Sequence, residues 1–104
     1  MIIMQGDAYY IPFLFFDDDG TKITNSMVDD VEIVFAGIRR TLSDNEIIYD
    51  STNKVFLFPL TQQETFGLSG IARGQVRIEF TNGDVIGESF GSIIVLPSDS
   101  RREL

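Results

Sequence analysis

Residues 74–90, GQVRIEFTNGDVIGESF, predict a β-hairpin from which the rest of the fold can be built outward. Val76, Ile78 and Phe80 alternate with polar residues, so their side chains share one face at the period of two that a strand requires. The dipeptide Asn82–Gly83 follows and favours a two-residue type I′ turn, because both central residues of that turn need positive φ. The alternating residues are therefore expected to form one wall of the core.

A two-residue turn also fixes how the two strands of this hairpin face each other. Phe80 would lie opposite Val85 on the core side, and Arg77 would lie opposite Glu88 on the polar side. Cross-strand pairs of this kind contribute roughly 0.2–1 kcal/mol each. Turn chemistry and register thus agree with one another.

Further strand patterns precede the hairpin, separated by turn signals every ~8–12 residues. Residues 31–36 predict a strand, because Val31, Ile33 and Phe35 occupy every second position. Residues 38–42 are expected to continue that strand past a bulge. Residues 46–49 and 55–58 predict a second hairpin, which Pro59 is expected to end.

One helix is expected between the two hairpins. Thr61 and Glu64 form a capping box, in which each side chain bonds to the backbone N–H of the other residue, and this predicts a short helix near residues 62–68. With six to seven short strands, the pattern is that of a mainly β chain folded as an antiparallel β-sandwich. Residues 1–97 are predicted to be a single domain, and residues 98–104 a polar tail that is frayed unless a partner orders it.

Composition excludes several kinds of chemistry. The chain has 104 residues, a net charge of −8, no Cys and no His. These absences remove disulfides, thiol chemistry, Cys/His zinc sites and Ser-His-Asp triads, so we predict a protein that is not an enzyme and has no cofactor. The negative charge disfavours nucleic acid and anionic membranes as partners. Neither an apolar run of ~18 residues nor a signal peptide is recognisable.

Two groups of carboxylates are candidate sites. Asp17, Asp18 and Asp19 are consecutive, so their side chains diverge, and no Glu follows at the spacing of an EF-hand. We interpret them as a solvated turn, with a weak divalent-cation site as the alternative. Glu79 and Glu88 could form the carboxylate pair of a glycosidase, but the adjacent Arg favours an ordinary sheet surface.

Residues 8–16, AYYIPFLFF, are apolar on both faces of a predicted strand. Pro12 cannot donate a ladder hydrogen bond, which favours either a position at the edge of a sheet or a bulge. A doubly apolar edge strand needs cover on its second face. Two explanations remain open, namely a neighbouring subunit, or the helix or N-terminal arm of the same chain.

Five motifs follow one another along the chain, namely Gln5-Gly6-Asp7, the Asp-rich turn at Gly20, residues 60–65, residues 75–77 and residues 82–86. Their order resembles small structural proteins encoded in the tail modules of phages and prophages of Gram-positive bacteria. It is also similar to the N-terminal immunoglobulin-like domain of phage baseplate upper proteins. The resemblance implies an immunoglobulin-like β-sandwich that works by assembly, and it brings no catalytic residues.

We therefore expect a non-enzymatic structural or assembly protein, encoded by a phage or prophage and acting in a virion tail or baseplate through protein–protein contacts. Its expected partners are other virion or tail proteins, or further copies of itself. Its expected location is the virion or the host-cell cytoplasm. The alternative is a small carbohydrate- or protein-binding module, with calcium at Asp17–Asp19 as an optional ligand. The candidate partner-contact residues are Tyr10, Phe13, Phe16, Arg101 and Arg102.

Overall fold

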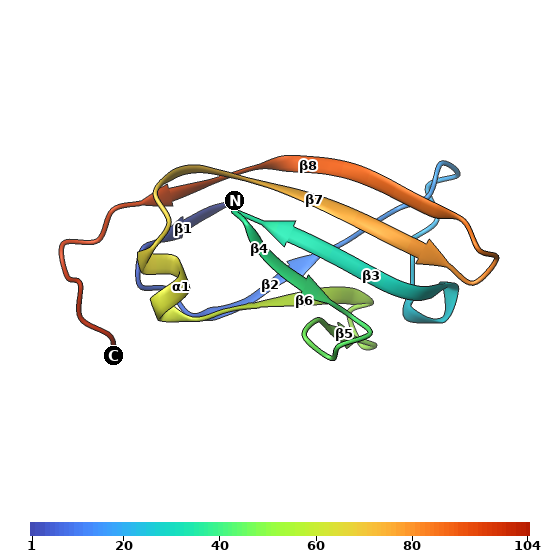
Figure 1. The fold of residues 1–104 in the computed structure, drawn as a ribbon, viewed down its shortest axis with the longest axis horizontal. Helices are drawn as coiled ribbons and strands as arrows, with labels where there is room; N and C mark the ends of the chain where they lie inside the picture. The colour runs from blue at the N-terminus through green and yellow to red at the C-terminus, as the bar shows by residue number, and fades with distance from the viewer.

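Two β-sheets pack face to face in the computed structural model, which describes residues 1–91 and 93–104 (Figure 1). Over these residues the chain has eight strands, one α-helix and one short 3-10 helix. The strands are β1 (Ile2–Met4), β2 (Tyr9–Phe13), β3 (Val28–Phe35), β4 (Ile38–Thr41), β5 (Ile48–Asp50), β6 (Val55–Leu60), β7 (Gly70–Phe80) and β8 (Val85–Leu96). The helices are η1 (Asn25–Met27) and α1 (Gln62–Phe66). The predicted β-sandwich is confirmed.

The two layers differ in width. One sheet has five strands in the order β1-β8-β7-β3-β4, and the other has three strands in the order β2-β6-β5. The prediction of six to seven strands was too low because the N-terminal segment forms β1. The prediction of a purely antiparallel sandwich was also wrong, since β1 pairs with β8 in parallel, with Ile3 opposite Val95. This pairing buries Ile3 in the core.

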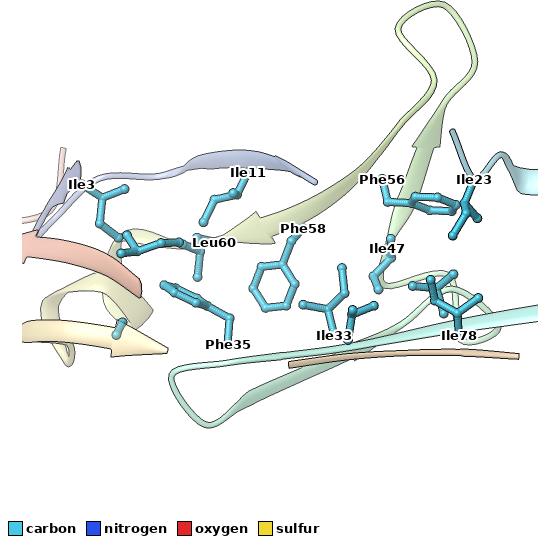
Figure 2. Packing of buried hydrophobic residues seen from close by; sticks show 14 of the residues in the cluster. Ile3, Ile11, Ile23, Ile33, Phe35, Ile47, Phe56, Phe58, Leu60 and Ile78 are labelled. Atoms are coloured by element: carbon cyan, nitrogen blue, oxygen red, sulfur yellow. The ribbon is translucent and has the colours of Figure 1, made fainter. Parts of the chain in front are cut away.

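Apolar side chains from both sheets fill the space between the layers (Figure 2). The rings of Phe35 in β3 and Phe58 in β6 meet edge to face, with centroids 6.0 Å apart. Val76 and Ile78 of β7 are buried and Phe80 is partly buried, so the predicted core wall is confirmed. The side chains with no exposed surface include Ile11, Val31, Ile33, Phe35, Phe56 and Phe58.

The hairpin of β7 and β8 forms, but in a different register from the predicted one. Its loop has three residues, and the N–H of Phe80 donates to the carbonyl of Asp84 at 2.8 Å. Only Gly83 has positive φ there, as a three-residue loop requires. Arg77 consequently lies opposite Gly87, and Glu88 lies opposite Val76. The predicted pairing of Arg77 with Glu88 is wrong, because the shift by one residue places them on opposite faces of the sheet.

The two-residue turn occurs instead between β3 and β4. Ala36 and Gly37 both have positive φ, at 52° and 80°, and they connect the paired residues Phe35 and Ile38. The chain therefore reverses at this point. The predicted bulge with a continuing strand is wrong, because this turn makes β4 a neighbour of β3 in the same sheet.

The second predicted hairpin is present as β5 and β6, but Pro59 lies within β6 and does not end it. Pro59 is paired with Tyr10 of β2, while β5 reaches only as far as Leu57, where Ile48 lies opposite. Pro59 thus has a neighbouring strand on one side only, which is a position that a residue without an N–H can occupy.

The capping box forms as predicted, and helix α1 contacts the turn that follows the N-terminal strand. The N–H of Glu64 donates to Oγ1 of Thr61 at 3.1 Å, and the N–H of Thr61 donates to Oε1 of Glu64 at 3.0 Å. The helix ends at Phe66, two residues before the predicted end. Within this helix, the buried hydroxyl of Thr65 accepts a hydrogen bond from the N–H of Gly6 at 3.0 Å and donates one to the carbonyl of Asp7 at 2.7 Å. This contact fixes the turn between β1 and β2.

Candidate interaction surfaces

Strand β2 lies at the edge of the three-stranded sheet, as Pro12 predicted. It is shorter than residues 8–16, and Phe16 follows as an isolated bridge to Lys22. Ile11 faces the core with no exposed surface. Tyr10 and Pro12, on either side of Ile11, are exposed and point away from the sandwich. The strand therefore carries apolar side chains on both of its faces.

The outward side of this sheet is an exposed apolar surface. Tyr10, Leu14 and Ile48 are 52%, 48% and 46% exposed. Leu57 connects them, because it lies opposite both Pro12 of β2 and Ile48 of β5. We call this surface the three-strand face; its residues are Tyr10, Pro12, Leu14, Ile48 and Leu57.

The three-strand face is not covered by the rest of the described chain. Strand β1, the N-terminal arm of the prediction, pairs with β8 in the opposite sheet. Helix α1 packs at the end of the sandwich against the turn that follows β1 (Figure 1). Cover by the helix or by the arm, one of the two explanations left open by the sequence, is therefore wrong.

Phe13 lies on the inner side of β2 and is not part of the three-strand face. Its ring stacks on Phe15 with centroids 6.2 Å apart and meets Phe58 edge to face at the same separation. It also contacts Phe90 of β8, with centroids 4.8 Å apart. Phe13 is therefore partly buried and joins the two sheets.

Phe16 is exposed, but it lies at the side of the sandwich. It lines a cavity of about 120 Å³, which we call the side cavity, together with Phe15, Ile23, Ile78 and Ile86. Asp17, Asp18 and Glu88 also line this cavity. Apolar and acidic residues thus line the same space.

A second apolar surface, which the sequence interpretation missed, covers the outer side of the five-stranded sheet near the N-terminus. Ile71 lies opposite Ile94, and Ile94 lies opposite Ile2, so three strands contribute one row. Ile2 and Ile71 are 63% and 64% exposed. We call this surface the five-strand patch; its residues are Ile2, Met4, Ile71, Ile94 and Leu96. The sequence did contain a sign of this patch, because residues 1–4 and 93–96 would be apolar on both faces of a strand.

Arg101 and Arg102 lie in the C-terminal segment, beside helix α1 (Figure 1). Nη1 of Arg101 donates to the carbonyl of Phe66 at 3.4 Å. The segment is further held by a hydrogen bond from the N–H of Ser98 to Oε1 of Gln5 at 3.2 Å. The structure therefore does not bring the two arginines together with Tyr10 or Phe16.

The predicted carboxylate groups do not converge. Oδ1 of Asp17 accepts from the N–H groups of Asp19 and Thr21 at 3.0 and 2.9 Å, so this carboxylate closes its own turn. Glu79 and Glu88 lie on opposite faces of their hairpin. Over residues 1–91 and 93–104, no three acidic side chains gather as metal ligands, and no helix is long and apolar enough to span a membrane.

The chemistry that these surfaces offer is burial of apolar area, with tyrosine as an amphipathic anchor in the three-strand face. The three-strand face and the five-strand patch lie on the outer sides of different sheets, so one partner could cover each. Comparison of the chain with protein-family models, with curated proteins and with solved structures finds no match.

Proposed function

We propose that this chain is a non-enzymatic structural protein that works by assembly, as a component of a phage or prophage tail or baseplate. The observation that carries the assembly role is the presence of two exposed apolar surfaces, one on the outer side of each sheet. Contiguous exposed apolar surface on a soluble domain is typical of protein–protein contact sites. Burying each surface against a partner would gain roughly 25 cal/mol per Å² of apolar area.

The strand order supports the finer assignment of an immunoglobulin-like topology. Taken in chain order, β2 to β8 correspond to strands B, C, C′, D, E, F and G of that fold. Strands B, E and D then share one sheet and C, F and G share the other, which is the immunoglobulin arrangement. The chain has neither the Trp nor the disulfide of antibody domains, since it contains no Trp and no Cys.

Two of the motifs behind the phage resemblance have structural roles, which supports using them as markers of a common fold. Gly6 in the first motif has a φ of 91° and lies against the ring of Phe66. Thr61 and Glu64 in the later motif form the capping box. Both motifs meet at the junction of helix α1 with the β1–β2 turn.

The assembly role is tested by light scattering on the purified protein, alone and mixed with the products of neighbouring genes. We expect species heavier than the 11.7 kDa monomer. The paired substitutions Tyr10→Ser with Leu14→Ser on the three-strand face, and Ile71→Thr with Ile94→Thr on the five-strand patch, should each reduce the average mass.

Val85→Thr is the matched control, because Val85 is exposed on the outer side of β8 but lies outside the five-strand patch. It should leave the mass unchanged, and melting temperatures will show whether any variant has unfolded. A protein that stays monomeric alone and with every neighbouring product would contradict the assembly role. The virion role further predicts tail or baseplate genes beside the coding sequence.

A further inference from the structure

Strand β8 has an open edge along its first half. In the five-stranded sheet it lies between β1 and β7, but β1 pairs only with Ile94–Leu96. Residues 85–90 pair with β7 on one side, and no other strand of the described chain lies along their second side. We call residues 85–90 the open edge.

The open edge presents unpaired backbone groups at regular spacing. In an antiparallel ladder, residues that exchange hydrogen bonds with the partner strand alternate with residues that do not. The ladder starts at the bond from the N–H of Phe80 to the carbonyl of Asp84. It follows that Val85, Gly87 and Ser89 direct their N–H and C=O groups away from β7. An extended chain could bond to all three residues.

Two of the features that protect edge strands are missing here, namely Lys and Pro. Such edges are usually shielded by Lys, Pro, bulges or inward-pointing charges. Residues 85–90 contain neither Lys nor Pro, and Val85 and Ile86 are more than half exposed. The single charge is Glu88, which lies opposite the buried Val76 and therefore on the inner side of the sheet.

Glu88 determines which strand could be added. Glu88 lines the side cavity together with Asp17, Asp18, Phe16 and Ile86. A second copy paired through the same edge would bring two such carboxylate groups together, in a chain whose net charge is −8. A strand with Lys or Arg would instead place its alkyl stem against the apolar side chains and its charge beside the carboxylates.

We propose that the open edge of β8 binds an extended strand of a partner protein in which a Lys or Arg side chain points at Glu88. This mode is β-augmentation, where backbone hydrogen bonds supply affinity and alternate side chains supply specificity. It goes beyond the assembly role, because it uses a sheet edge and neither of the two apolar surfaces. Each proposal can fail while the other stands.

The test titrates the isotopically labelled full chain with two blocked seven-residue peptides of alternating Thr and Val, one with Lys and one with Glu at the centre. We expect the Lys peptide to shift and protect the amide signals of Val85, Gly87 and Ser89. Its Kd should be about three- to tenfold lower than that of the Glu peptide, as for one partly desolvated charge pair.

The substitution Glu88→Lys should invert the order of the two peptides, and Glu88→Gln should make them nearly equal. Glu79→Lys is the matched control, because Glu79 lies on the outer side of the same hairpin, and it should preserve the order. Equal binding of both peptides to the wild-type chain, shifts outside the open edge, no binding, or self-association through β8 would each overturn the proposal. Melting temperatures confirm that every variant is folded.

Discussion

Gly74→Ala tests how the two sheets are held together beside the open edge. Gly74 lies opposite Phe90 in the β7–β8 pairing, and a Cβ added to Gly74 would overlap the Cζ and Cε2 atoms of the Phe90 ring. That ring also contacts Phe13 of the other sheet, with centroids 4.8 Å apart. The absence of a side chain at Gly74 is therefore what lets Phe90 reach across the sandwich.

The expected change in the free energy of unfolding combines two costs and one gain. Full burial of a Phe side chain is worth about 1.5–3 kcal/mol, and Phe90 is partly buried, so its displacement would cost about half of that. Losing the contact with Phe13 would cost about 0.5–1.5 kcal/mol more. Replacing Gly by Ala in a strand returns roughly 0.5–1 kcal/mol through reduced backbone freedom. We expect Gly74→Ala to lower the free energy of unfolding by about 1–2 kcal/mol.

Thermal and urea unfolding followed by circular dichroism measure this change. The melting temperature should fall by about 4–8 °C for each kcal/mol. Gly91→Ala is the control, because a Cβ there meets nothing within 4 Å, and it should be neutral or stabilising. In a Phe90→Leu background the cost of Gly74→Ala should shrink, since the ring is gone. An unchanged stability of Gly74→Ala, or an equal cost in both backgrounds, would refute the steric explanation.

Three further changes probe helix α1 and its junction. Thr65→Val should cost about 1–3 kcal/mol in urea unfolding, because it leaves the Gly6 turn without its buried hydroxyl partner, whereas Thr65→Ser should cost less. Gly6→Ala should lower the melting temperature, because its φ of 91° disfavours a side chain. Burial raises the pKa of Glu64, but hydrogen bonds from Thr61 and Arg40 outweigh it and leave the pKa below 4.5. Glu64→Gln should therefore be less stable than wild type at pH 7, with a difference in unfolding free energy that shrinks as the pH falls below 4.5.

Local rules predicted the parts of the fold that depend on neighbouring residues. The capping box at Thr61 and Glu64 and the alternation in β3 and β7 both appear as expected. The hairpin register was not predictable in the same way, because Asn-Gly suits loops of two or of three residues. A distant contact accompanies the longer loop here, with the N–H of Thr81 donating to the carbonyl of Met27 at 3.2 Å. That one-residue difference determines which face Glu88 occupies.

The candidate surfaces were found only in part. The presence of apolar residues on both faces of residues 8–16 indicated an exposed surface, but it could not show which face was outside. Tyr10 faces outward and Phe13 faces inward, although both were expected contacts. The five-strand patch was missed because its row of Ile2, Ile71 and Ile94 comes from three segments distant in sequence.

The side cavity follows from the unequal widths of the two sheets, and the open edge follows from the short pairing of β1 with β8. Neither feature can be recognised from the sequence of one strand. At about 4.8 Å between strands, the four strands β8-β7-β3-β4 beside the open edge are roughly 5 Å wider together than the three-stranded sheet, so they overhang it on at least one side. The β4 side is closed, because Arg40 pairs with Glu64 and lies 5.7 Å from the ring centroid of Phe58. The overhang therefore falls on the β8 side, where Phe90 still reaches Phe13 of the second layer. Burying an unpaired charge between two sheets is costly. Glu88 lies on the inner side of β8 but remains exposed, because no second layer covers this part of the strand.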